Sequence, residues 1–365
     1  MKKINNLIDY IEWRGDLPFT KEPFNELDNL LFSVFSYIDY SGIVGGVHGV
    51  TDIFEKAVKF SDAMNKIENF YPERKYLGAI ITGKIIDVAF TAAKAKRFSD
   101  VYISCYENIV DEKANMQFSA TVFILPDESV FISYRGTDDT LVGWKEDFYM
   151  TFESPVPSQV KASEYLETVA SLTHFPIRLG GHSKGGNLAI WSAVKSSDAV
   201  KKRIINAYNN DGPGFPHDFY ESDECRSISD RLVKIIPDSS VVGLMLEESD
   251  YYKVVKSSEK SIYQHDPFSW ETKVNCFVPA DGISEFSKKS DLVLKKWLAS
   301  LSNEERREFI DIVFNALGSG NAKTLTDLNS SRMKSAASVA HSMRELDKES
   351  RKNLIAVLRR LISFI

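Results

Sequence analysis

Cysteine is scarce in this 365-residue chain: only Cys105, Cys225 and Cys276 occur, an odd number with wide spacing. Such a set fits neither a disulfide framework nor a zinc site, and it favours a reducing compartment, so we expect a cytoplasmic protein. No apolar run approaches the roughly 18 residues of a membrane-spanning helix. Near the first residue, Asp9 and Glu12 interrupt the apolar stretch that a signal peptide requires.

The chain also lacks any long basic run, and its net charge is −6. Nucleic acid is therefore not an expected partner. Hydrophobic residues make up 43% of the chain and aromatic residues 12%, which is enough for a sizeable core and argues against disorder.

The pattern of apolar residues divides the chain into three regions. Residues 1–80 are mostly helical by pattern, as in "FNELDNLLFSVFSYI", and are expected to pack on the core. Residues 81–285 are expected to form the core of the fold, although a helix is still predicted over 76–90. Residues 286–365 show no strand pattern and are expected to be helical.

The middle region alternates strand and helix patterns. The strand candidates, rich in β-branched and aromatic residues, are "VYISCYENIV", "FSATVFILP", "SVFISYRG", "PIRLG", "RIINAYN", "RLVKIIP" and "YYKVVKS". The second and third are separated by "DE", which predicts a hairpin. This order predicts an α/β fold whose central sheet begins antiparallel and is mostly parallel thereafter.

The last region has two features of its own. Ser302 and Glu305 form a capping box that predicts a helix start. The final segment, "DKESRKNLIAVLRRLISFI", predicts a basic amphipathic helix. Contact with a membrane surface and plain packing on neighbouring helices are the two alternatives for it.

The segment "PIRLGGHSKGGNLAIWSAV" contains a G-x-S-x-G pentapeptide, Gly181 to Gly185, between a strand and a helix. Glycines are needed there because a Cβ at Gly181 or Gly185 would collide with the neighbouring strand or helix. The turn would hold the Ser183 hydroxyl clear of the sheet edge and direct the first helix amides toward a developing oxyanion. Ser183 is therefore the candidate nucleophile.

A serine nucleophile needs a histidine base and an orienting carboxylate, and in this motif both follow the serine. Of the later histidines, His265 in "IYQHDPFSW" is the candidate base, because it lies in a predicted loop at the sheet edge. Asp238, directly after the strand "RLVKII", is the candidate acid. Asp211 and Asp266 are weaker rivals.

The oxyanion hole needs a second donor beside the backbone amide of Lys184. Thr137 in "ISYRGTDD" offers a backbone N–H and a hydroxyl at a strand end, and Gly136 lets the backbone approach closely. The Lys184 side chain either attracts an anionic substrate or covers apolar surface with its stem. The following segment, 138–158, is a lid, a wall of the acyl pocket or a plain loop.

These motifs together resemble those of known hydrolases. "SYRGT", "GWKEDF" and "GGHSKGG" are similar to the motifs of class 3 (fungal-type) lipases. The resemblance implies an α/β-hydrolase core with Ser183, Asp238 and His265 as the triad and Thr137 and Lys184 as oxyanion donors. The flanking "YIEWRGDLPF", "NNDGPGF" and "QHDPFSW" resemble the bacterial Mbeg1-like family (formerly DUF2974).

The resulting hypothesis is a serine hydrolase that cleaves a carboxylic ester through an acyl-enzyme. It would use no metal or organic cofactor, and its expected partner is a small acyl ester or a lipid. An acyltransferase or thioesterase with the same triad, and a non-catalytic binding protein on a hydrolase scaffold, are the alternatives.

Overall fold

The computed structural model describes residues 5–70, 84–247, 249, 251–330 and 332–364. The predicted helix over 76–90 falls largely on residues 71–83, which lie outside the described residues. Its remaining part belongs to α4 (Lys84–Lys94).

A central sheet of eight strands organises the described chain, and its spatial order follows the sequence order. The strands are β1 (Val58–Lys59), β2 (Tyr102–Asp111), β3 (Met116–Ile124), β4 (Val130–Tyr134), β5 (Ile177–His182), β6 (Ile204–Asn210), β7 (Leu232–Pro237) and β8 (Lys253–Val255). Strands β1 to β4 pair antiparallel and β4 to β8 pair parallel. The predicted α/β class, with an antiparallel start and a mostly parallel sheet, is confirmed.

The predicted hairpin is the β3–β4 connection. Ile124 pairs with Val130 across the ladder, and Leu125 N–H donates to the Ser129 carbonyl at 2.9 Å. A smaller antiparallel pair, β9 (Thr272–Lys273) and β10 (Cys276–Phe277), lies outside the main sheet.

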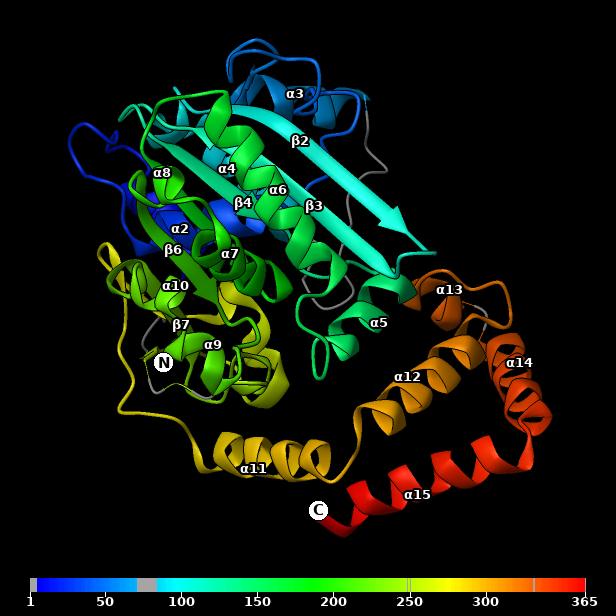
Figure 1. Cartoon of the computed structure of the whole chain (residues 1–365). Helices are drawn as coiled ribbons and strands as arrows, with labels where there is room; N and C mark the ends of the chain where they lie inside the picture. Colours follow the sequence, from blue (N-terminus) through cyan, green and yellow to red (C-terminus); the bar gives the residue numbers. More distant parts are fainter. Residues whose placement is uncertain (1–4, 71–83, 248, 250, 331, 365) are drawn as a thin grey trace.

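Helices cover both faces of the sheet (Figure 1). One face carries α1 (Leu7–Arg14), α2 (Glu26–Phe35), α3 (Phe60–Phe70) and α4, and the other carries α6 (Pro157–Ser171) and α7 (Lys184–Lys195). Side chains alternate between the two sides, as a strand requires. Phe123 and Phe131 join the cluster around α2, whereas Val122 and Ile132 join the cluster around α6 and α7. The core therefore has two layers, separated by the sheet.

Short helical segments make most of the remaining connections. They are α5 (Leu141–Tyr149), α8 (Asp198–Lys201), α9 (His217–Glu221), α10 (Asp223–Arg226) and the 3₁₀ turns η1 (Lys96–Phe98), η2 (Ser229–Arg231), η3 (Val242–Leu244), η4 (Ser261–His265) and η5 (Pro267–Ser269).

A buried ion pair ties the amino-terminal helices to the rest of the chain. The Arg97 Nε donates to Asp28 Oδ1 at 2.7 Å, and the Tyr10 hydroxyl donates to the same oxygen at 3.0 Å. Both charged side chains are fully buried. Removing either partner would leave a buried charge uncompensated, which makes this pair costly to break.

The carboxy-terminal helices form an arm beside the sheet layer, drawn in yellow to red in Figure 1. They are α11 (Glu285–Ala299), α12 (Asn303–Gly318), α13 (Leu325–Ser330), α14 (Arg332–Glu345) and α15 (Lys348–Phe364). The predicted capping box is present, with Ser302 Oγ accepting from the Glu305 N–H at 3.2 Å. On α15, Val357 packs with Trp297 of α11, and Ile362 is exposed.

None of the helices in the described ranges is both long and apolar enough to cross a membrane.

Candidate active site

The G-x-S-x-G turn joins β5 to α7, and Ser183 stands at its apex. Its backbone is left-handed, with φ 59° and ψ −136°. A non-glycine residue rarely adopts this conformation, and such strain is characteristic of functional sites. His182 and Lys184 on either side are buried, but Ser183 is partly exposed. The turn therefore presents the serine hydroxyl, as the sequence motif predicts.

The glycines of the turn have the predicted steric reason. A Cβ on Gly181 would lie 2.2 Å from the carbonyl carbon of Gly185, and one on Gly185 would lie 2.0 Å from the Tyr134 carbonyl oxygen. Both distances are far shorter than van der Waals contact. Backbone from β4, β5 and α7 meets at this point and leaves no room for a side chain.

His265 and Asp211 form the buried pair next to the turn. The Nδ1–H of His265 donates to Asp211 Oδ2 at 2.7 Å, and the side chains are 4% and 1% exposed. A proton held on Nδ1 leaves the Nε2 lone pair free to act as a base. The second carboxylate oxygen, Oδ1, accepts a hydrogen bond from Ser240 Oγ at 2.5 Å. His265 lies at the end of η4, not in an irregular loop.

The prediction that Asp238 contacts His265 is wrong. Its Oδ1 accepts instead from Gln264 Nε2 at 2.8 Å. The reason is the strand order: Asp211 follows β6, which is the neighbour of the serine strand β5, whereas Asp238 follows β7, one strand further away. The other rival, Asp266, accepts from the Phe268 N–H at 3.0 Å at the start of η5.

A second histidine, His182, supports the first. The two rings lie 4.4 Å apart between centroids, and His182 Nε2 is 2.9 Å from the His265 carbonyl oxygen. That oxygen can only accept, so Nε2 carries the proton. Burial and the neighbouring His265 lower the pKa of His182 well below its ordinary value, which keeps the ring neutral. The Tyr37 hydroxyl lies 3.4 Å from Nδ1 of the same ring.

The sequence analysis gives no role to His182 or Tyr37. For His182 a signal exists, because it lies inside the pentapeptide next to the candidate nucleophile. Tyr37 follows α2, nearly 150 positions before the turn, and no local signal marks it.

Thr137 lies shortly after β4 and lines the same cavity as Ser183. Its hydroxyl donates to Asp147 Oδ2 at 2.5 Å. A hydroxyl has a single proton, so the backbone N–H is the donor that Thr137 retains for another group. Lys184 is the first residue of α7, where amides have no partner within the helix. Thr137 and Lys184 both line the cavity that contains Ser183.

The Lys184 ammonium does not face solvent, because its side chain is 1% exposed. Nζ donates to the Gln117 carbonyl at 2.9 Å and to Glu146 Oε2 at 3.0 Å, and it lies 3.8 Å from Asp147 Oδ1. Lys184 therefore neither attracts a substrate at the surface nor covers apolar surface, the two roles that the sequence suggested. Its ammonium group is the centre of a buried ion cluster. Burial raises the pKa of Asp147 to about 6, although Lys184 and Thr137 act in the opposite direction.

One cavity collects these groups, and we call it the nucleophile cavity. Its volume is about 220 Å³. Its lining residues are Tyr37, Thr137, Trp144, Asp147, Phe148, Ser183, Lys184, Pro213, Val241, Val242, Met245, Ile262 and His265. Ser183 and His265 share an otherwise largely apolar space, which suits an apolar substrate held by a few polar groups.

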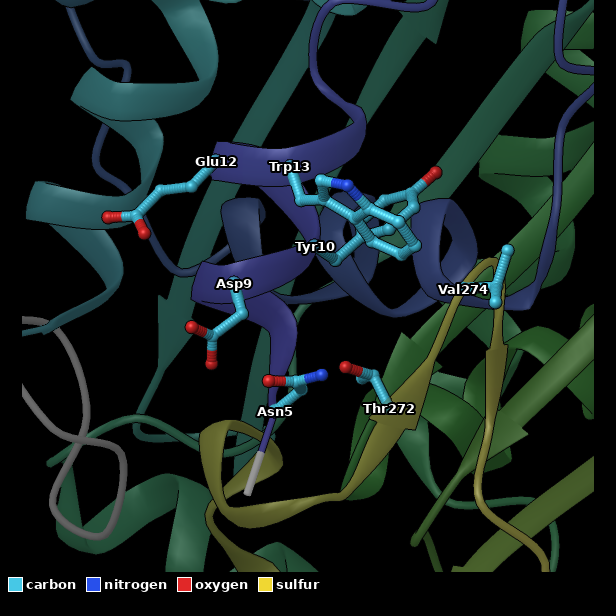
Figure 2. Close-up of a pocket in the computed structure, with 7 residues that line it drawn as sticks. All are labelled: Asn5, Asp9, Tyr10, Glu12, Trp13, Thr272 and Val274. Carbon is cyan, nitrogen blue, oxygen red and sulfur yellow. The ribbon is translucent and has the colours of Figure 1, made fainter. Parts of the chain in front are cut away.

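A different cavity, of about 340 Å³, lies beside α1 (Figure 2). Tyr10, Trp13 and Val274 form its apolar side, and Asp9 and Glu12 are its acidic residues. It contains neither a candidate nucleophile nor a histidine, so it does not share the chemistry of the nucleophile cavity. In the part of the chain that the structure describes, no three His, Cys, Asp or Glu side chains are grouped so as to hold a metal ion.

Comparison with known proteins gives one family match. The Mbeg1-like family model matches residues 92–315, more than half of the chain. No curated protein matches.

Several solved structures are similar, among them the following three. The native Rhizomucor miehei lipase propeptide complex is 14% identical, over 50% of this chain and 68% of that chain, with a TM-score of 0.33. M37 lipase is 16% identical, over 60% and 70%, with a TM-score of 0.34. A fungal lipase–inhibitor complex is 11% identical, over 63% and 78%, with a TM-score of 0.35.

Proposed function

The chain belongs to the Mbeg1-like family, and we propose that it is a serine hydrolase that cleaves carboxylic esters. The observation that carries the proposal is the left-handed Ser183 at the strand–helix turn, in one cavity with His265, whose Nδ1 is held by Asp211. A nucleophile, a base and an orienting acid are the three parts that acyl transfer by this mechanism requires.

In the proposed reaction the Ser183 oxygen attacks the ester carbonyl carbon while His265 Nε2 accepts the hydroxyl proton. The backbone N–H groups of Lys184 and Thr137 stabilise the oxyanion. The C–O bond to the alcohol then breaks, and His265 returns the proton to the departing alcohol. Water hydrolyses the acyl-enzyme by the same steps, which releases the acid and restores Ser183. Asp211 keeps the proton on Nδ1 and stabilises the imidazolium.

His182 supports the base in this proposal. Its neutral ring packs against the imidazole and fixes the His265 backbone through the carbonyl oxygen. The base is therefore fixed from two directions, by Asp211 at its ring and by His182 at its main chain. Such support holds a catalytic group within the narrow range of geometry that reaction needs.

A reducing location is part of the proposal. The three cysteines are free thiols, and Cys105 and Cys225 are buried. This is the state in which a cytoplasmic compartment would keep them.

The test combines covalent labelling with an ester assay. A fluorophosphonate probe should label the wild-type chain, and p-nitrophenyl butyrate should be hydrolysed. Both activities should disappear in Ser183→Ala and persist in Ser171→Ala, since Ser171 is an exposed serine at the end of α6. Labelling that survives Ser183→Ala would disprove the assignment of the nucleophile.

A further inference from the structure

A second hollow lies next to the nucleophile cavity, between the core and α11, and we call it the arm groove. Its volume is about 470 Å³. The core contributes Met150, Phe152 and Leu246 to its lining, and α11 contributes Leu294 and Leu298. Apolar side chains therefore line it from both sides.

The arm groove adjoins the nucleophile cavity. Met245 lines both hollows. Two other segments also pass from one to the other: the end of α5 and the residues after it supply Phe148 to the cavity and Met150 to the groove, and the loop after β6 supplies Pro213 to the cavity and Pro216 to the groove. Three chain segments thus contribute to the lining of both hollows.

The cations that border the groove are held by other groups. Lys295 Nζ lies 2.9 Å from Asp291 Oδ2 and donates to the Glu247 carbonyl at 2.8 Å. Arg306 Nη1 donates to the Thr151 carbonyl at 2.7 Å. Both cations are thus held at the border of the groove, although Arg306 Nε has no hydrogen-bond partner among the described residues. Apolar side chains form most of the remaining lining.

The arm is fixed in place, so the groove is a built feature of the fold. Ile310 of α12 packs into a buried cluster with Tyr149 and Met150. Asp311 accepts from the Tyr149 hydroxyl at 2.5 Å and pairs with Lys145 Nζ at 2.7 Å. Figure 1 shows α12 beside α5, and α11, which precedes α12 in the chain, below the sheet layer in this view.

We propose that the arm groove is the acyl-chain subsite, which receives the unbranched hydrocarbon chain of an ester whose carbonyl lies at Ser183. This inference rests on the proposed ester hydrolase function. The nucleophile cavity alone is smaller than a usual ligand pocket, which occupies roughly 300–1,000 Å³. A medium- or long-chain fatty acyl group would pass Met245, whose flexible side chain adapts to an occupant, and lie between the core and α11.

Acyl-chain preference gives the test. Each methylene buried in the groove should raise kcat/KM about fourfold, from about 0.8 kcal/mol per buried CH₂. The wild-type chain should therefore prefer p-nitrophenyl laurate over p-nitrophenyl butyrate. Leu294→Trp fills the groove and should lower the laurate-to-butyrate ratio of kcat/KM on the order of 10–100-fold, the effect of two or three methylenes.

The matched control is Leu292→Trp, because Leu292 lies on the same helix and is 51% exposed. It should keep the wild-type ratio. Leu298→Trp provides a second blocked groove in case Leu294→Trp fails to fold. An unchanged ratio in a folded blocked variant, or the same drop in Leu292→Trp, would overturn the subsite.

A binding measurement separates this inference from the proposed function. Sodium laurate is titrated calorimetrically into Ser183→Ala, alone and combined with Leu294→Trp or Leu292→Trp. Binding that Leu294→Trp abolishes and Leu292→Trp keeps would support the groove even if no ester were hydrolysed. Absence of laurate binding would overturn the groove, and would leave hydrolysis of butyrate as separate support for the proposed function.

Discussion

Replacing Asp211 by asparagine tests the catalytic arrangement most directly. The structure gives Asp211 two engaged oxygens, one on His265 Nδ1 and one on Ser240 Oγ. Ser240 Oγ also accepts from the Gly243 N–H at 2.9 Å, so its own proton is directed toward Asp211. In Asp211→Asn, Ser240 therefore selects the amide orientation that keeps the amide oxygen on its own side. The amide NH₂ then faces His265.

An NH₂ group facing Nδ1 forces the imidazole into the wrong tautomer, with the proton on Nε2 and no base for Ser183. A tautomer error of this kind costs a factor on the order of 10⁴ in kcat, or about 5 kcal/mol of transition-state stabilisation. The size and shape of the side chain are retained, so the variant should fold. The assay is p-nitrophenyl butyrate hydrolysis, with the melting temperature measured on the same preparation.

Asp238→Asn is the matched control. Its carboxylate accepts from Gln264 Nε2 and does not contact His265, and an asparagine oxygen can accept the same bond. Its kcat should stay close to that of the wild type. Adding Ser240→Ala to Asp211→Asn removes the group that selects the amide orientation, and it should recover part of the activity. A large loss in Asp238→Asn with an active Asp211→Asn would refute this reasoning.

Three further predictions concern the groups around the oxyanion site. Loss of an oxyanion donor costs roughly 10²–10³-fold in kcat. Thr137→Val should lower kcat by much less than this, because the Thr137 hydroxyl donates to Asp147. A loss of the full size at unchanged melting temperature would mean that the hydroxyl itself binds the oxyanion. The pKa of Asp147 is raised from 3.8 to about 6, so between these values the folded chain binds more protons than the unfolded chain, and stability falls as the pH rises through that window. In urea unfolding, the free energy of unfolding should fall between about pH 4 and about pH 7 by up to about 3 kcal/mol more in the wild type than in Asp147→Asn, because the other titrating groups are common to both chains. Lys184→Met should lower the free energy of unfolding by about 3–5 kcal/mol, since it leaves Glu146 buried without its cation. Adding Glu146→Gln should bring the midpoint of urea unfolding part of the way back to that of the wild type. No recovery would contradict the role of the ion pair.

Much of the fold could be predicted because its signals are local. Runs rich in β-branched and aromatic residues indicate the strands, and a short turn between two such runs marks the β3–β4 hairpin. The Ser302–Glu305 capping box starts α12 where the motif requires. The strand–glycine–serine–glycine–helix pattern is likewise local, because the tight turn itself leaves no room for side chains at Gly181 and Gly185. Each of these features depends on residues within a few positions of one another.

The acid could not be chosen from the sequence, because the choice depends on which strands are neighbours. Asp211 and Asp238 both follow a strand and both precede His265. Only the strand order, with β6 beside β5, decides that Asp211 reaches the histidine. The buried partners of Lys184 were hidden for the same reason, since Gln117 lies on β3, far from the turn along the chain.

The backbone at the ends of β5 and β6 supports the choice of Asp211 independently of its hydrogen bonds. Ser183 and Asp211 both have a left-handed φ, 59° and 50°, and the Ser183 N–H donates to the carbonyl of Asn210, the residue before Asp211, at 3.0 Å. Each such conformation costs of order 1–3 kcal/mol for a non-glycine residue and persists only where the surrounding structure enforces it. Asp238 is not among the residues with positive φ. Seven other described non-glycine residues also have a positive φ, so the conformation alone does not mark a site. Ser183 and Asp211 combine it with positions directly after the adjacent strands β5 and β6, which is what we expect if the two side chains serve one reaction.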